Sequence, residues 1–153
     1  MQQSKKNLTI LIVEDDEGDI LSIKRALKKC KLDNPIFVAH DGVEALEILR
    51  EGKQVVWPYL ILLDINMPRM NGLQFLEELR QDEELKKAVV FVLTTSDDEK
   101  DMVSAYEKNI AGYLLKQNVL DDFLSLVSLV DQFSLTVRYP STHSQQPSNK
   151  PIL

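Results

Sequence analysis

The sequence predicts an α/β protein built on a doubly wound, five-stranded parallel sheet. Short runs rich in Ile, Leu and Val alternate along the chain with amphipathic segments of helical spacing, and this alternation occurs five times. The runs are apolar at nearly every position, which is typical of parallel strands buried on both faces. Right-handed crossovers between such strands place helices on both sides of the sheet.

The first two strand-and-helix pairs are short and clearly separated. Residues 8–13 form an apolar run that ends abruptly in three acidic residues. Residues 20–30 then place apolar side chains three and four positions apart between lysines and arginines, which predicts an amphipathic helix. The pair Asn34-Pro35 interrupts this pattern, so a second strand is expected over 35–39 and a second helix over 43–50.

The remaining pairs follow an unusually apolar loop at 51–59. The pair Asn71-Gly72 opens the third helix, and Leu73, Leu76 and Leu79 form its apolar stripe. The next strand is indicated by a continuous, β-branched run. The elements predicted in this part are strands over 60–65, 89–95 and 112–116 and helices over 71–79, 97–109 and 119–135.

Composition narrows the class of protein. The hydrophobic fraction of 44% and the charged fraction of 27% are ordinary for a folded protein of one domain. The net charge of −6 argues against nucleic-acid or membrane partners and favours a protein partner. Cys30 is the only cysteine, which excludes an internal disulfide and fits a reducing cytoplasm. The N-terminal apolar run is too short for a signal peptide or a membrane helix.

The chain is expected to divide into a folded domain and two flanking segments. Residues 8–135 contain all the predicted strands and helices, and residues 1–7 form an N-terminal extension. Residues 136–153 are polar and rich in Pro and Ser, so they bury too little apolar surface to order themselves. We expect this last segment to be a flexible tail.

Polar side chains gather where the predicted strands end. Glu14 and Asp15 follow the first strand, Asp64 ends the third, Thr94 the fourth and Lys116 the fifth. The carboxyl ends of parallel strands share one edge of the sheet, which is where ligands bind in such folds. Three carboxylates in one pocket repel each other unless a proton or a cation compensates their charge. Oxygen ligands suit a hard cation such as Mg²⁺.

The motifs around these residues resemble the response-regulator receiver family. They are VEDDEGD after the first strand, LLDINMPRMNG at the third, LTTS at the fourth and GYLLK at the fifth. The resemblance covers residues 8 to about 135 and implies a flavodoxin-like (βα)5 receiver fold. The loop before the third strand and the polar tail also resemble stand-alone regulators that partner phytochrome-type histidine kinases.

The resemblance implies a set of roles at the strand ends. Glu14, Asp15, Asp64 and the backbone carbonyl of Asn66 are implied to hold Mg²⁺ or Mn²⁺, and Asp64 to accept a phosphoryl group from a histidine kinase. Lys116 is implied to stabilise charge on the transferring oxygens. The protein would then be a single-domain response regulator of a two-component phosphorelay, which catalyses only its own phosphorylation and dephosphorylation.

Two further residues are implied to carry the signal. Thr94 is implied to donate its hydroxyl to the bound phosphoryl group, and Tyr113 to move inward as Thr94 shifts. The neighbouring Thr95 is the alternative switch residue, and Tyr113 has an alternative as ordinary packing. We interpret Asp16, Glu17 and Asp19 as solvated loop acids.

Two other functions remain open from the residues alone. A pseudo-receiver would keep the fold as a protein-binding module without being phosphorylated. A phosphatase of the haloacid-dehalogenase type also forms an aspartyl phosphate, but it needs an acid two residues after the nucleophile, where this chain has Asn66.

Two features depart from expectation. Most family members have proline after the strand-five lysine, often with a cis bond, whereas Lys116 precedes Gln117. A cis bond to a non-proline residue costs about 2.5–4 kcal/mol, so this bond is expected to be trans.

The helix over 119–135 has an apolar arc wider than one core contact needs, which predicts a homodimer through the strand-five and helix-five region. The apolar loop residues Val55, Val56 and Trp57 are a second candidate contact.

Overall fold

The computed structural model describes residues 8–29, 33–118 and 128, and its sheet confirms the predicted fold class. Five parallel strands pair in the order β2-β1-β3-β4-β5. The strands are β1 (Thr9–Val13), β2 (Ile36–Ala39), β3 (Tyr59–Leu63), β4 (Val89–Thr94) and β5 (Gly112–Leu115). The helices are α1 (Glu17–Lys29), α2 (Gly42–Glu51), α3 (Gly72–Gln81) and α4 (Glu99–Glu107), and a 3₁₀ turn spans Lys116–Asn118.

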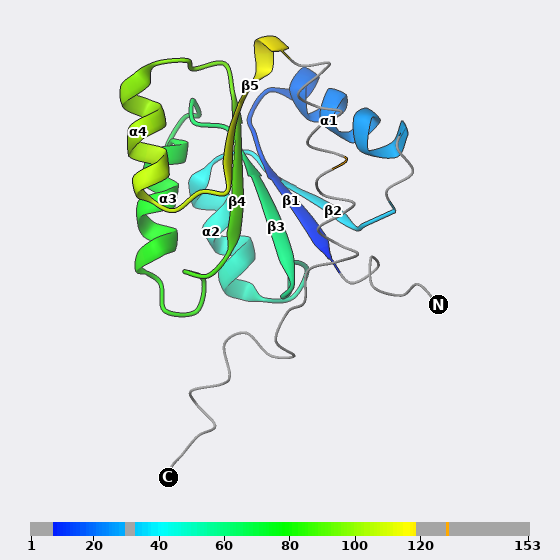
Figure 1. The fold of residues 1–153 in the computed structure, drawn as a ribbon. Coiled ribbons are helices and arrows are strands. Elements are labelled where there is room, and N and C mark those ends of the chain that lie inside the picture. Colours follow the sequence, from blue (N-terminus) through cyan, green and yellow to red (C-terminus); the bar gives the residue numbers. More distant parts are fainter. Residues whose placement is uncertain (1–7, 30–32, 119–127, 129–153) are drawn as a thin grey trace.

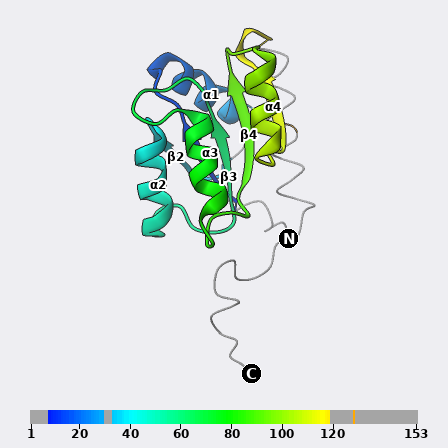
Figure 2. The same ribbon diagram turned by 90° about the vertical axis from the view of Figure 1, so that its left-hand side faces the viewer.

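Among the described residues, helices lie on both faces of the sheet. The α1 helix lies on one face, whereas α2, α3 and α4 lie side by side over the other (Figures 1 and 2). Apart from Ser128, which is helical, the predicted helix over 119–135 lies outside the described residues, as do Cys30 and both flanking segments. Within the described ranges, no helix has the length and apolar character needed to cross a membrane.

Alternation along the central strands builds a separate core on each face. In β1, Leu11 and Val13 join the cluster that packs against α2, α3 and α4, while Ile10 and Ile12 join the cluster beneath α1. Every residue of β1 and β3 is buried. These strands are therefore held from both sides, which gives the site at their ends a rigid base.

Strand register brings the predicted site residues to one edge. Val13 pairs with Leu63, so Glu14 and Asp64 come next to each other beyond the last paired residues. The Asp64 amide donates to the Val13 carbonyl at 2.9 Å, and this bond continues the ladder past the strand end. Thr94 pairs with Leu115, which puts Lys116 one residue beyond the end of β5.

The apolar loop before β3 packs into the core of its own protein. Val55 is buried, and Trp57 packs against the larger core cluster with its ring edge-on to Tyr59 at a centroid separation of 5.8 Å. The strand also starts one residue earlier than predicted, because Tyr59 pairs with Thr9. Val55 is therefore a core residue and is wrong as a candidate contact, whereas Trp57 is partly buried and Val56 is exposed.

The inward stripe of α3 also differs from the prediction. Phe75 is completely buried, as are Leu76 and Leu79, whereas Leu73 is only half-buried. Asn71 forms a capping box with Gln74, which fixes where the helix begins.

Gly72 lets α3 begin directly against the segment that carries Asp64. A Cβ atom at this position would lie 2.5 Å from the Asp64 carbonyl oxygen and 2.7 Å from the Ile65 Cα. Both neighbours are backbone atoms, so they have no rotamer by which to move away. The Gly72 amide also donates to the Ile65 carbonyl at 2.8 Å. Glycine at this position therefore allows the close approach of helix and loop.

Replacing Gly72 by alanine should destabilise the protein by about 1–3 kcal/mol, because the added methyl group overpacks fixed backbone. The free energy of unfolding in urea measures the effect. Gly18→Ala is the matched control, since its Cβ would lie 3.4 Å from Asp16 Oδ2 within α1. Alanine there should be neutral or stabilise by up to about 1 kcal/mol. Equal stabilities for the two variants would contradict the close-approach argument.

Candidate functional site

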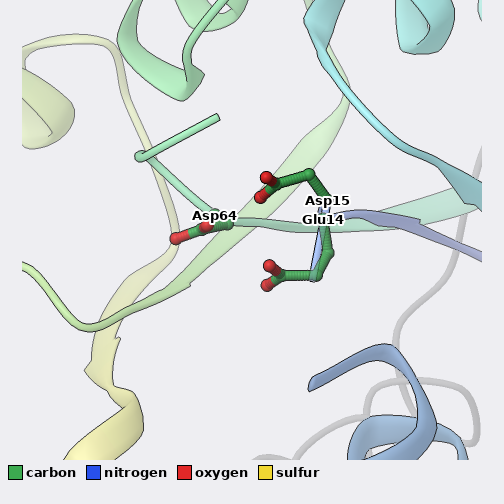
Figure 3. Close-up of side chains that lie close together, drawn as sticks. All are labelled: Glu14, Asp15 and Asp64. Atoms are coloured by element: carbon green, nitrogen blue, oxygen red, sulfur yellow. The ribbon is translucent and has the colours of Figure 1, made fainter. Parts of the chain in front are cut away.

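Three carboxylates converge at the carboxyl edge of the sheet. Oxygen atoms of Glu14, Asp15 and Asp64 lie within 4.8 Å of one another, and Figure 3 shows the two residues after β1 directing their carboxylates toward Asp64. Glu14 is 2% exposed and Asp64 is 5% exposed, whereas Asp15 is open to solvent. The cluster therefore has two buried acids and one exposed acid at its entrance.

Lys116 lies against this cluster from the end of β5. Its Nζ donates to Glu14 Oε1 at 2.6 Å and lies 3.8 Å from Asp64 Oδ2. The Lys116–Gln117 peptide bond is trans, since the cis peptide bond of the described chain is Trp57-Pro58. The sequence thus correctly predicted that Glu14, Asp15, Asp64 and Lys116 come together.

Asp19 is a site residue that sequence reasoning missed. The Lys116 Nζ also donates to Asp19 Oδ2 at 2.6 Å, so this acid is paired with the buried lysine. Interpreting it as merely a solvated acid missed this pairing, although its side chain is partly exposed; Asp16 and Glu17 are exposed as predicted. The available signal was its place in the first turn of the helix that follows the acid pair, close to the carboxyl edge of the sheet.

Burial shifts the protonation of the two inner acids. Burial raises the pKa of Glu14 to about 7; the hydrogen bond from Lys116 opposes this shift and the Asp64 charge adds to it. Burial also raises the pKa of Asp64, against the charge of Lys116 and the smaller effects of the Thr94 hydroxyl and the Asn66 amide. Burial lowers the pKa of Lys116, but its hydrogen bonds to Asp19 and Glu14 outweigh that effect and the net shift is upward.

The donor set fits a hard divalent cation. Glu14, Asp15 and Asp64 supply three carboxylates, and the adjacent ammonium group of Lys116 offsets only part of their charge. Asp64 Oδ1 is buried and makes no hydrogen bond within the described part of the chain, although Thr94 and Asn66 lie close enough to favour its charged form. A buried carboxylate oxygen without a partner is costly, and a cation held by oxygen ligands relieves that cost.

The loop after β3 is held by contacts with the β2–α2 turn. Arg69 adopts a φ of 60° and donates to both carboxylate oxygens of Asp41, at 2.7 and 3.2 Å. Asp41 in turn caps α2 by accepting from the Glu44 amide. Asn66, the predicted carbonyl ligand, lies in this loop two residues after Asp64 and is exposed. The bidentate pair therefore restrains the loop that carries Asn66.

The end of β4 is connected to β5 by hydrogen bonds. Thr94 is completely buried, whereas Thr95 is exposed. The Tyr113 hydroxyl donates to the Ser96 carbonyl at 2.8 Å, and the Ser96 amide donates to Thr94 Oγ1 at 3.3 Å. Tyr113 is thus tied to the loop immediately after Thr94. This geometry makes Thr94, rather than Thr95, the hydroxyl that faces the site.

A family model for the response regulator receiver domain matches residues 10–128. The chain belongs to this family. Response regulator Rcp1 of Synechocystis sp. is 35% identical over 143 residues, covering 91% of this chain and 97% of Rcp1. Chemotaxis protein CheY-3 of Vibrio cholerae is 32% identical over 111 residues, covering 72% of this chain and 82% of CheY-3. The receiver is therefore a signalling domain rather than a classical enzyme.

Solved structures agree with this assignment. The Mn²⁺-bound form of response regulator Rcp1 superposes with a TM-score of 0.73 at 36% identity, covering 87% of this chain and 99% of that chain. The phosphorylated cyanobacterial phytochrome response regulator RcpA gives a TM-score of 0.72 at 31% identity, covering 88% of this chain and 98% of that chain. Both similarities support a receiver of the stand-alone type.

Affinity for Mg²⁺ should increase by about tenfold between pH 6 and pH 8, because the cation competes with the proton on Glu14. The pKa of this acid is raised to about 7 by burial, so its protonated form predominates below that pH. Isothermal titration calorimetry at each pH measures the affinity. In Glu14→Gln, which has no proton to displace, the increase should be much smaller. The same affinity for the wild-type protein at pH 6 and pH 8 would contradict the prediction.

Proposed function

We propose that this protein is a single-domain response regulator that accepts a phosphoryl group on Asp64 from a histidine kinase. The observation that carries the proposal is a buried carboxylate with one oxygen lacking a hydrogen bond, set between two further acids and a buried lysine. A carboxylate in this setting is a shielded nucleophile beside a fixed positive charge. Family membership and the stand-alone relatives favour this function over a module that is not phosphorylated.

The reaction is a displacement at phosphorus. An oxygen of Asp64 forms the new bond while the bond from phosphorus to the kinase histidine nitrogen breaks, and the imidazole leaves with the electron pair. Lys116 places its ammonium group beside the transferring oxygens and offsets their charge. Hydrolysis of the acyl phosphate by water returns the carboxylate and releases inorganic phosphate.

We assign the cation site to Mg²⁺ or Mn²⁺, held by Glu14, Asp15, Asp64 and the backbone carbonyl of Asn66. When bound, the cation supplies positive charge that balances the acids and the incoming phosphoryl oxygens. The support is the oxygen-only donor set, together with the Mn²⁺-bound form known for the relative Rcp1.

The signal is proposed to leave the site through Thr94 and Tyr113. Thr94 would donate its hydroxyl to the phosphoryl group, and the adjoining loop is already bonded to Tyr113 through Ser96. A gain of about 1.5–2 negative charges at Asp64 is enough to bias such a loop. The output is then contact with another protein from the surface formed by α4, β5 and the predicted last helix.

The partner is proposed to be a histidine kinase of the phytochrome type, in the cytoplasm. The similarity to RcpA, a phytochrome response regulator, is the basis for this choice.

We retain residues 8–135 as the receiver domain, flanked by segments 1–7 and 136–153. A homodimer through the strand-five and helix-five region also remains a proposal, and sedimentation of a monomer at high concentration, phosphorylated or not, would reject it.

Replacing Asp64 by asparagine should abolish phosphoryl uptake from acetyl phosphate and Mg²⁺, because the nucleophilic oxygen is lost while the shape is kept. Intact-mass measurement gives the labile gain in mass. Asp97→Asn, in the exposed loop after β4, is the matched control and should label like the wild-type protein. An unlabelled wild-type protein would reject the proposed function and revive the pseudo-receiver alternative.

Thr94→Ala should slow phosphoryl uptake by about tenfold or more, since it removes a buried hydroxyl donor aimed at the phosphoryl oxygens. Thr95→Ala tests the neighbouring exposed hydroxyl and should leave the rate within about twofold, because removing a solvated group changes little. Initial rates with acetyl phosphate give the comparison. A larger loss in Thr95→Ala would reverse the assignment of the two threonines.

A further inference from the structure

Lys116 is held from two sides, and one of the two contacts belongs to no role described so far. Its side chain is only 9% exposed, and its Nζ donates at 2.6 Å both to Glu14 at the end of β1 and to Asp19 on α1. We propose that Asp19 is a positioning residue for phosphoryl transfer, which holds the Lys116 ammonium group where the transferring oxygens will lie. This inference rests on the proposed function of Asp64.

Lys116 forms a long ion pair with the nucleophile and two short ones with Glu14 and Asp19. Lys116 Nζ lies 3.8 Å from Asp64 Oδ2, which is longer than a hydrogen bond, although both side chains are almost fully buried. An unrestrained lysine beside a buried carboxylate would close this gap, since the attraction between opposite charges is strong where water is excluded. The two shorter contacts, to Glu14 and to Asp19 on α1, hold the ammonium group beyond hydrogen-bond distance of Asp64.

Asp19 is better placed than Glu14 to keep this contact during the reaction. Glu14 belongs to the cluster of three acids whose oxygens approach within 4.8 Å, so a bound cation takes a share of its charge. Asp19 is absent from that cluster and remains available to Lys116 when the cation is bound. Its exposed fraction of 40% leaves its other oxygen solvated, so the pairing does not bury a further charge.

The backbone of α1 holds Asp19 in place. The Asp19 amide donates to Asp16 Oδ2 at 2.9 Å, which caps the first turn of the helix. The next residue, Ile20, is buried, and Ile23 packs with Ile10 and Ile12 beneath the sheet. The carboxylate therefore projects from a packed helix. Lys116, the donor that this carboxylate restrains, then needs little reorganisation when charge develops on the phosphoryl oxygens.

The test compares initial rates of labelling by acetyl phosphate with Mg²⁺. Asp19→Asn keeps the shape but removes the charge, and it should slow labelling by about fivefold, which corresponds to about 1 kcal/mol of transition-state stabilisation. Glu17→Gln is the matched control, because it removes the same charge from the same turn and its carboxylate pairs with His40 instead. This control should label at the wild-type rate. Asp19→Glu restores the charge and should recover part of the loss.

A double-mutant cycle separates positioning from general stability. In a Lys116→Met background, Asp19→Asn should have no further effect on the rate, because the side chain through which Asp19 acts is gone. Thermal unfolding of every variant shows that each is folded at the assay temperature. The proposal is overturned if Asp19→Asn labels like Glu17→Gln, or if it slows labelling equally with and without Lys116.

Failure of this inference is distinguishable from failure of the proposed function. If the wild-type protein takes up no phosphoryl group, phosphorylation at Asp64 is rejected. The role of Asp19 in phosphoryl transfer is then rejected with it. A wild-type protein that is labelled, with Asp19→Asn labelled equally fast, rejects only the positioning role.

Discussion

The burial of acidic side chains against a single lysine is the constraint on which this protein depends. Glu14 and Asp64 lose most of their hydration at the sheet edge, and Lys116 compensates only part of their charge. An isolated carboxylate would avoid this cost by taking a proton, and the raised pKa of Glu14 shows that tendency. This incompletely balanced charge is the physical basis of the cation site and the phosphoryl transfer that we propose.

The hydrophobic clusters on both faces of the sheet hold the buried acids in this unfavourable arrangement. The strands that end at the site, β1 and β3, are buried along their whole length, and α3 begins in direct contact with the backbone around Asp64. A flexible support would let the acids separate and become hydrated. Close packing on both faces prevents this separation. The stability of the core therefore offsets the cost of burying the acids.

Hydrogen bonds connect the acidic site to neighbouring segments of the protein. Thr94 faces the acids, and the loop that follows it is bonded to Tyr113 on the neighbouring strand. On the other side of the site, Lys116 joins the end of β5 to α1 through Asp19. A change of charge at Asp64 therefore meets two sets of directional contacts, which are the kind of element that a new charge can bias.

Apolar periodicity and the abrupt acids after strand ends were enough to predict the parallel sheet and the meeting of Glu14, Asp15, Asp64 and Lys116. These features follow from local pattern, because parallel strands bring their carboxyl ends to a common edge. Local pattern favoured Thr94 over Thr95, and Thr94 is the buried one of the two, but it did not reveal the Asp19 contact or the burial of Val55 and Phe75. Those depend on helix rotation, loop packing and distances between segments remote in the chain, which only the tertiary structure decides.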